Sequence, residues 1–198
     1  MRARRASAGS ASSPFSAPPS GYLWTTQNAA GSTTDDDSDL NILTHKTAAT
    51  TLQAGENDPS LDAGLVATAK LGNYVWADNN LNGKQDSSED GVQNVTVRLL
   101  DGTGAQARDD NGVLIPDTLT DVDGLYSFAG LRPGQYEIQF VLPAGYMFTT
   151  KDAASTTDMN DSDAIVSGAN VGRTAINTLT PNETDNSWDA GFTPLASS

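Results

Sequence analysis

Apolar and polar residues alternate along several short stretches of the chain. Over residues 94–99 and again over 135–140, every second residue is apolar. The apolar positions are Val95, Val97 and Leu99 in the first stretch and Tyr136, Ile138 and Phe140 in the second. A period of two is typical of a strand with one buried face. We therefore expect two strands whose polar residues, Glu137 among them, face solvent.

Turn sequences separate these stretches from their neighbours. The segments 123–124, 132–134 and 143–145 read DG, RPG and PAG, and such combinations favour tight turns. No stretch of about twelve residues has the period of an amphipathic helix. Short strands at this spacing predict an all-β fold, and more specifically an antiparallel β-sandwich.

The chain also repeats itself. Residues 19–39 align with residues 143–163 without a gap. Further along, residues 51–65 align with residues 178–192, in the same order and at nearly the same spacing. Two matched blocks in one order indicate a tandem array of small modules.

This repetition predicts the domain organisation. One complete module is expected at 69–193, preceded at 19–68 by the C-terminal part of another. Residues 1–18 are rich in Ser, Pro and small residues, so they are expected to be a disordered leader. Residues 194–198 form a short tail.

Residues 78–89 match the twelve-position calcium loop of EF-hands. The residues at the ligand positions are Asp78, Asn80, Asn82, Lys84 (through its carbonyl), Asp86 and Glu89. Gly83 stands where such a loop must bend sharply. The flanks are rich in β-branched and aromatic residues, so the loop joins strands rather than helices. We predict that calcium orders this long surface loop; the alternative is a solvated connection that binds no ion.

The charge balance narrows the possible partners. The chain has 25 Asp and Glu residues against 11 Lys and Arg, a formal net charge of −14. Nucleic acid is therefore not an expected partner, because its phosphates would be repelled. No apolar run approaches the roughly 20 residues of a membrane helix, so membrane insertion is not expected either. Cysteine is absent, so no disulfide is expected. The basic residues at the start are not followed by an apolar stretch, so a signal peptide is not expected there.

Several short motifs follow one another along the complete module. They are the runs from Gly72 to Asp86, Gly91 to Leu99, Thr120 to Phe128, Leu131 to Tyr136, Pro143 to Tyr146, Asp161 to Asp163, and Trp188 to Phe192. This series resembles the SdrD B-like domains. The resemblance implies a calcium-binding β-sandwich, immunoglobulin-like or prealbumin-like. It also implies an extracellular or cell-surface setting, in which such modules stand in tandem between the binding head and the wall anchor of bacterial adhesins.

The resemblance implies further calcium ligands. These candidates are Asp121, Asp123, Asp161 and Asp163, with Asp37 and Asp39 as the counterparts of the last two in the partial repeat. Asp101 and Asp158 are candidates to complete a coordination shell. The alternative is turn chemistry, since Asp-Gly is a common hairpin signal.

No residues are expected to be catalytic. His45 is the chain's one histidine; it lies in the partial repeat, and we expect a surface residue rather than a general base. Related collagen-adhesin B-type modules form a Lys–Asn isopeptide bond promoted by a Glu in a Y-x-x-x-E run. Phe140 takes the place of that Glu here, so no such crosslink is expected.

We expect a calcium-stabilised structural module of an extracellular repeat protein, serving as a rigid spacer or a fibre building block. Its expected partners are calcium ions and copies of the same chain, joined head to tail where the partial repeat takes up strands. An adhesin-type binding module for a host protein or glycan is one alternative. An accessory domain of a secreted enzyme is the other.

Overall fold

A computed structural model describes residues 10–11, 17–28, 37–154 and 156–195 of the chain. The chain divides into two compact units, residues 1–67 and residues 68–198. Within the described segments every helix or strand assigned is a strand, so the predicted all-β class is confirmed. In the same segments no helix is long and apolar enough to cross a membrane.

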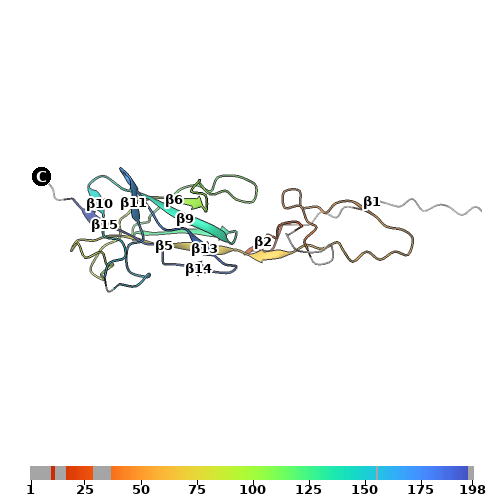
Figure 1. Cartoon of the computed structure of the whole chain (residues 1–198), viewed down its shortest axis with the longest axis horizontal. Coiled ribbons are helices and arrows are strands. Elements are labelled where there is room, and N and C mark those ends of the chain that lie inside the picture. Colours follow the sequence, from red (N-terminus) through yellow and green to blue (C-terminus); the bar gives the residue numbers. More distant parts are fainter. Residues whose placement is uncertain (1–9, 12–16, 29–36, 155, 196–198) are drawn as a thin grey trace, which may run out of the picture. The chain divides into compact units, whose positions relative to one another are not determined.

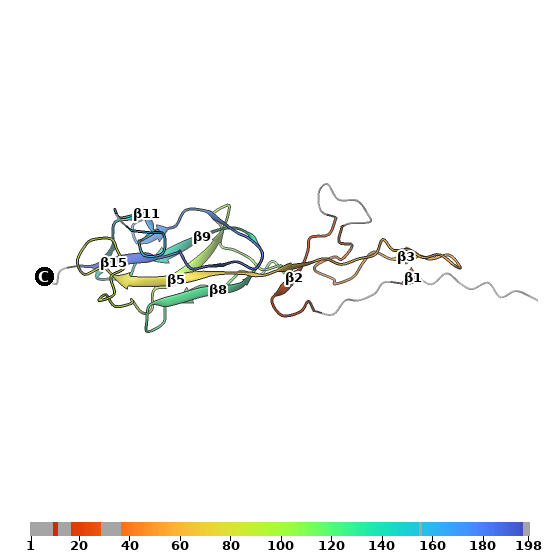
Figure 2. The same cartoon turned by 90° about the horizontal axis from the view of Figure 1, so that it is seen from below.

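The second unit contains eleven of the strands (Figure 1). They are β5 (Ala69–Ala77), β6 (Thr96–Asp101), β7 (Thr118–Leu119), β8 (Leu125–Leu131), β9 (Gly134–Val141), β10 (Tyr146–Phe148), β11 (Ile165–Gly168), β12 (Val171–Arg173), β13 (Asn177–Leu179), β14 (Thr184–Asp185) and β15 (Ala190–Pro194). One sheet has the order β10-β15-β5-β14, with β8 on the other edge of β5. The other has the order β11-β12-β9-β6-β7, with β13 also pairing with β9. The two sheets form a β-sandwich, and Figure 2 shows β5 and β8 in one layer and β9 in the other.

The first sheet is mixed, which differs from the purely antiparallel sandwich predicted from the sequence. β15 and β14 both run parallel to β5, with Ala190 opposite Val75 and Thr184 opposite Lys70. A parallel neighbour needs a long crossover connection, and here the whole module lies between the two strands. Local patterns of alternation carry no information on this long-range pairing.

The core lies between the two sheets. Leu71, Val75 and Phe192 contribute from one sheet and Ile138 and Phe140 from the other, all fully buried. The predicted inward faces of 95–99 and 136–140 are confirmed. Aromatic rings join the layers, since Tyr126 on β8 meets Phe140 on β9 edge to face at 5.7 Å.

The prediction that Glu137 faces solvent is wrong. Its residue is buried, and its carboxylate lies 3.4 Å from the Arg173 guanidinium on the neighbouring strand β12. The alternation is therefore correct for the apolar face, whereas the opposite face of β9 is partly covered by its neighbours in the sheet.

The first unit is smaller. Its strands are β1 (Ser10–Ala11), β2 (Tyr22–Trp24), β3 (Thr50–Thr51) and β4 (Leu65–Ala67). β2 pairs with β4 and β1 pairs with β3, both antiparallel. β1 falls within the segment that the sequence predicts to be a disordered leader.

Candidate metal centre

The 78–89 loop begins where β5 ends, and its first residue is fixed from several sides. Asp78 is fully buried, and its N–H donates to the Phe192 carbonyl (2.9 Å). Its two carboxylate oxygens accept the N–H groups of Asn82 (3.2 Å) and Gly83 (2.9 Å), and the Thr149 hydroxyl also donates to it. These four contacts fix the position of the carboxylate at the first ligand position of the loop.

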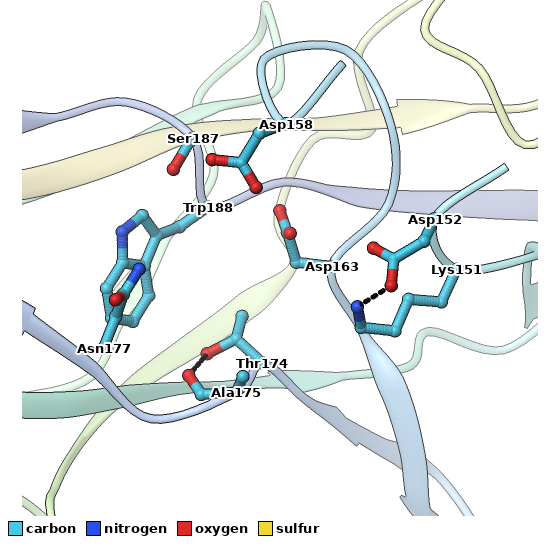
Figure 3. A pocket seen from close by; sticks show the side chains of 9 residues that line it. All are labelled: Lys151, Asp152, Asp158, Asp163, Thr174, Ala175, Asn177, Ser187 and Trp188. Atoms are coloured by element: carbon cyan, nitrogen blue, oxygen red, sulfur yellow. Dashed lines mark hydrogen bonds and ion pairs between the residues drawn. The ribbon is translucent and has the colours of Figure 1, made fainter. Parts of the chain in front are cut away.

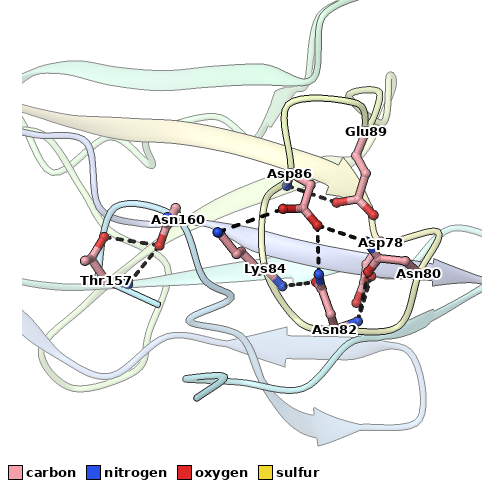
Figure 4. Close-up of polar contacts among 8 residues, drawn as sticks. All are labelled: Asp78, Asn80, Asn82, Lys84, Asp86, Glu89, Thr157 and Asn160. Atoms are coloured by element: carbon pink, nitrogen blue, oxygen red, sulfur yellow. Dashed lines mark hydrogen bonds and ion pairs between the residues drawn. The ribbon is translucent and has the colours of Figure 1, made fainter. Parts of the chain in front are cut away.

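Three side chains in the middle of the loop converge (Figure 4). The amide nitrogens of Asn80 and Asn82 both donate to Oδ2 of Asp86, at 2.9 and 2.7 Å. These two hydrogen bonds lower the pKa of Asp86, with a smaller contribution from Lys84. The amide oxygens of both asparagines accept backbone N–H groups of the loop itself.

Glu89 closes the loop. Its carboxylate accepts the N–H groups of Asn79 (2.8 Å) and Asp86 (3.2 Å), so the last position of the motif is tied to the first part of the loop. Gly83 has a φ of +71°, and a Cβ there would lie 2.8 Å from the Thr150 carbonyl. The bend thus requires glycine for both backbone conformation and space.

The structure brings this loop against the second predicted acidic motif. Lys84 forms an isolated antiparallel bridge with Asp161, and the Gln85 N–H donates to the Asn160 carbonyl (3.0 Å). The two segments are far apart in sequence, and nothing in either motif indicated that they would meet. The candidate ligands of 78–89 and of 157–163 therefore belong to one end of the sandwich.

A group of carboxylates lies beside this contact, with Asp161 and Asp189 buried and Asp163 half-buried. Asp161 is buried; its Oδ2 accepts the Thr156 hydroxyl (2.9 Å), and its Oδ1 has no hydrogen-bond partner. Oδ2 of Asp163 accepts the N–H of Asp189 (2.8 Å). Asp189 is fully buried and accepts the N–H of Tyr74 and the Asn73 amide, both at 3.1 Å.

Burial changes the acidity of two of these groups. It raises the pKa of Asp189 to about 8, with a smaller contribution from the neighbouring Asp163 carboxylate. It likewise raises the pKa of Asp163 to about 7, and Asp158 and Asp161 add to that rise. Figure 3 shows Asp158 and Asp163 lining one pocket, of about 270 Å³. Ionising these two carboxyl groups in the folded chain therefore costs free energy.

Asp189 is the site residue that the sequence reasoning missed. It stands between Trp188 and Ala190, in the closing motif of the series, from which no site residue was predicted. A signal was present, because Asp62 occupies the matching place in the partial repeat, between apolar residues Leu61 and Ala63. An acidic residue that stands twice between apolar neighbours at matching places is a candidate for a buried polar site.

Asp121 and Asp123 lie in the turn between β7 and β8. Oδ1 of Asp121 accepts the N–H groups of Asp123 (3.0 Å) and Leu125 (2.9 Å), which is the turn chemistry left open above. Asp101 makes the same kind of turn, accepting the Thr103 N–H at 2.8 Å. Among the described residues, no three or more His, Asp or Glu side chains are grouped as metal ligands.

The candidates in the first unit repeat the contacts of the second. Asp37 has a buried Oδ1 without a hydrogen-bond partner, as Asp161 does. Oδ2 of Asp39 accepts the Asp62 N–H (3.0 Å), as Asp163 accepts that of Asp189. His45 lies in this unit, 6.5 Å from the Trp24 ring between ring centroids.

The fold and the site together define a β-sandwich module with an acidic polar loop at one end. The chain belongs to the SdrD B-like domain family, whose sequence model matches residues 69–192. It is 40% identical over 142 residues to serine-aspartate repeat-containing protein D of Staphylococcus aureus strain Newman, covering 71% of this chain and 10% of that protein. It is 38% identical over 149 residues to the bone sialoprotein-binding protein of S. aureus strain MRSA252, covering 74% and 12%. The chain thus spans about a tenth of the length of these curated relatives.

A solved structure is also similar. It is the minor pilin of the Gram-positive pathogen Streptococcus agalactiae, with a TM-score of 0.44 and 13% sequence identity. The similarity covers 78% of this chain and 66% of the pilin.

Proposed function

We propose that the complete module is a calcium-stabilised structural module of an extracellular, cell-surface repeat protein, acting as a rigid spacer or as a building block of a fibre. Family membership supports the structural role. The observation that carries the calcium part is the gathering of Asp161, Asp163 and Asp189 in and around one buried region, with an unpartnered oxygen on Asp161. A cation that neutralises buried carboxylates of this kind stabilises the folded state.

The 78–89 loop supplies the oxygen atoms that calcium prefers. The side chains of Asp78, Asn80, Asn82, Asp86 and Glu89 and the Lys84 carbonyl would hold the ion, within the usual six to eight oxygen ligands. The hydrogen bonds from the two asparagine amides to Asp86 would be replaced, because the amide oxygens rather than the nitrogens must face a cation. Calcium supplies positive charge and coordination here.

A second set of ligands would be Asp161 and Asp163, with Asp158 and Asp189 next to them. Because the Lys84–Asp161 bridge joins this set to the 78–89 loop, ions at the two places would stiffen the same end of the sandwich. An ion that binds only the folded state stabilises it by an amount that rises with ion concentration. A module of this kind would be stiff in a calcium-rich exterior and looser without calcium.

The test is calorimetric titration of calcium into the wild-type chain and into an Asp78→Ala/Glu89→Ala variant. Loss of two charged ligands should remove one high-occupancy site and shrink the rise in melting temperature that calcium produces. An Asp109→Ala/Glu183→Ala variant removes the same charge from two loops outside the candidate centre and should titrate like wild type. Unchanged stoichiometry in the first variant would contradict calcium binding by the 78–89 loop.

A further inference from the structure

The dipeptide Asn-Gly occurs twice in the chain, at 82–83 in the 78–89 loop and at 111–112 between β6 and β7. An asparagine before a glycine is chemically labile, because glycine has no side chain to shield its backbone nitrogen from the amide carbon of the asparagine. Both glycines have a positive φ, +71° for Gly83 and +76° for Gly112. The two pairs therefore share one chemistry and differ in their surroundings.

The bend of the 78–89 loop requires glycine in the first of these pairs. A Cβ at residue 83 would lie 2.8 Å from the Thr150 carbonyl oxygen and 2.8 Å from the Cβ of Ala153. The positive φ also disfavours any other residue there. Asn82 stands at the fifth position of the loop, where its amide oxygen is a candidate calcium ligand. The loop thus places a ligand amide directly before a glycine that cannot be replaced without strain.

Three contacts lie at the atoms that an attack by Gly83 on the Asn82 amide would use, and Figure 4 shows this amide between Lys84 and Asp86. The Gly83 N–H, whose nitrogen would attack, donates to Oδ2 of Asp78 (2.9 Å). The amide oxygen of Asn82, on which negative charge would develop, accepts the Lys84 N–H (2.8 Å). The amide nitrogen, which would leave, donates to Oδ2 of Asp86 (2.7 Å).

Without an ion, these hydrogen bonds alone hold the Asn82 amide, and the residue is exposed to solvent. Each contributes about 1 kcal/mol, so the side chain can leave them and turn toward the Gly83 nitrogen. A cation in the loop would bind the Asn82 amide oxygen and the Asp78 carboxylate. It would therefore hold the amide in place and occupy the group that accepts the Gly83 proton.

We propose that Asn82 is a site of spontaneous deamidation and that calcium bound in the 78–89 loop suppresses the reaction. The suppression rests on the proposed function, whereas the deamidation does not. The Gly83 nitrogen bonds to Cγ of Asn82 and loses its proton, while the amide nitrogen takes up a proton and leaves as ammonia. The product is a succinimide ring, which water opens at either carbonyl carbon. The net change is that amide and water become carboxyl and ammonia.

The two products differ in their effect on the loop. Opening at Cγ gives aspartate, which adds a carboxylate at a position where calcium loops accept Asp as well as Asn. Opening at the backbone carbonyl carbon gives isoaspartate, whose main chain is longer by one methylene group. That longer chain would displace the Gly83 N–H from Asp78 and the Gln85 N–H from the Asn160 carbonyl. Time without calcium would thus convert part of the protein into a form with a damaged loop.

The experiment incubates the full chain at mildly basic pH with calcium or with EDTA and follows both Asn-Gly pairs by peptide mapping and mass spectrometry. Asn111 is the internal control, because it is exposed in a turn outside the candidate centre, where the Gly112 N–H donates to the Asp109 carbonyl (2.9 Å). It should convert equally fast in both solutions. Asn82 should convert in EDTA. Calcium at about a hundred times its Kd should slow that conversion by up to about a hundredfold, since only ion-free loops react.

The products are then tested for calcium binding by calorimetric titration. Asn82→Asp, which reproduces the aspartate product, should bind calcium at least as tightly as fresh wild type, because calcium affinity depends on the charge of the ligands. Isoaspartate-containing chain, separated from the aged sample by ion exchange, should lose the site of the 78–89 loop. An isoaspartate fraction that titrates like fresh chain would overturn the predicted damage to the loop.

Titration of the fresh chain separates this proposal from the proposed function. If calcium binds and Asn82 converts equally fast in calcium and in EDTA, the suppression is overturned and calcium binding stands. If Asn82 keeps its amide in EDTA while Asn111 converts, the deamidation is overturned. Conversion of Asn82 in EDTA by a chain that binds no calcium would support the deamidation and overturn both the suppression and the proposed function.

Discussion

Replacing Asp189 by asparagine should change the sign of its effect between calcium-free and calcium-loaded protein. Asp189 is fully buried, accepts two hydrogen bonds from Asn73 and Tyr74, and lies next to Asp163. Asparagine has the same shape without the charge, so it keeps the acceptor for Tyr74 and loses the bond from Asn73. Loss of that bond should cost about 1 kcal/mol.

The pKa of Asp189 sets the opposing effect. In the folded chain it is raised from 3.8 to about 8, so the folded state keeps a proton that the unfolded state releases. Without calcium, stability should therefore fall as pH rises from about 4 to 8. Each pKa unit is worth about 1.4 kcal/mol, which gives an upper bound of about 5–6 kcal/mol at about pH 8 and less than 2 kcal/mol at about pH 5. Asp189→Asn should thus be nearly neutral at the lower pH and stabilising by several kcal/mol at the higher one.

Calcium should reverse the order of stability of wild type and Asp189→Asn, because a bound cation favours the ionised carboxylate that asparagine lacks. The assay is urea unfolding of wild type and Asp189→Asn at about pH 5 and 8, each with EDTA and with calcium. Asp109→Asn, the same substitution in an exposed loop, serves as the control. Equal pH dependence of wild type and Asp189→Asn in EDTA would refute the electrostatic reasoning. A variant that gains as much from calcium as wild type would remove Asp189 from the metal centre.

Two further predictions concern packing and covalent chemistry. Gly91→Ala should destabilise the module by about 2–4 kcal/mol in the same assay, because its Cβ would lie 2.0 Å from the Asp123 carbonyl; Gly134→Ala, whose nearest atom is 3.9 Å away, should change stability by less than about 1 kcal/mol. The intact mass should equal the sequence mass, since Phe140 is a core residue where an acid would be needed to promote a crosslink; a loss of about 17 Da, one ammonia, would show that another acid promotes an isopeptide bond.

The sequence predicts the strands well and their long-range arrangement poorly. Alternation identifies Val95, Val97 and Leu99 as one buried face, because successive side chains of a strand point to opposite faces of the sheet. The parallel pairing of β15 with β5 joins the two ends of the module and leaves no periodic mark on either segment. The same limit applies to the site. The loop pattern at 78–89 is visible in the sequence, whereas its contact with Asp161 exists only once the sheets are assembled.

The matching segments of the two units separate what the hydrogen bonds do from what burial does. The N–H groups of Asp62 and Gly64 donate to Asp39 and Ser38 within the first unit, as those of Asp189 and Gly191 donate to Asp163 and Ser162 in the second. The apolar residues differ, because Phe192 is fully buried and its counterpart Leu65 is 42% exposed. The same hydrogen-bonded frame therefore forms in both units, whereas the burial of Phe192 in the second unit also depends on the strand β5 that pairs with β15. Cations would act on this frame from its acidic end, and they would leave its apolar face unchanged.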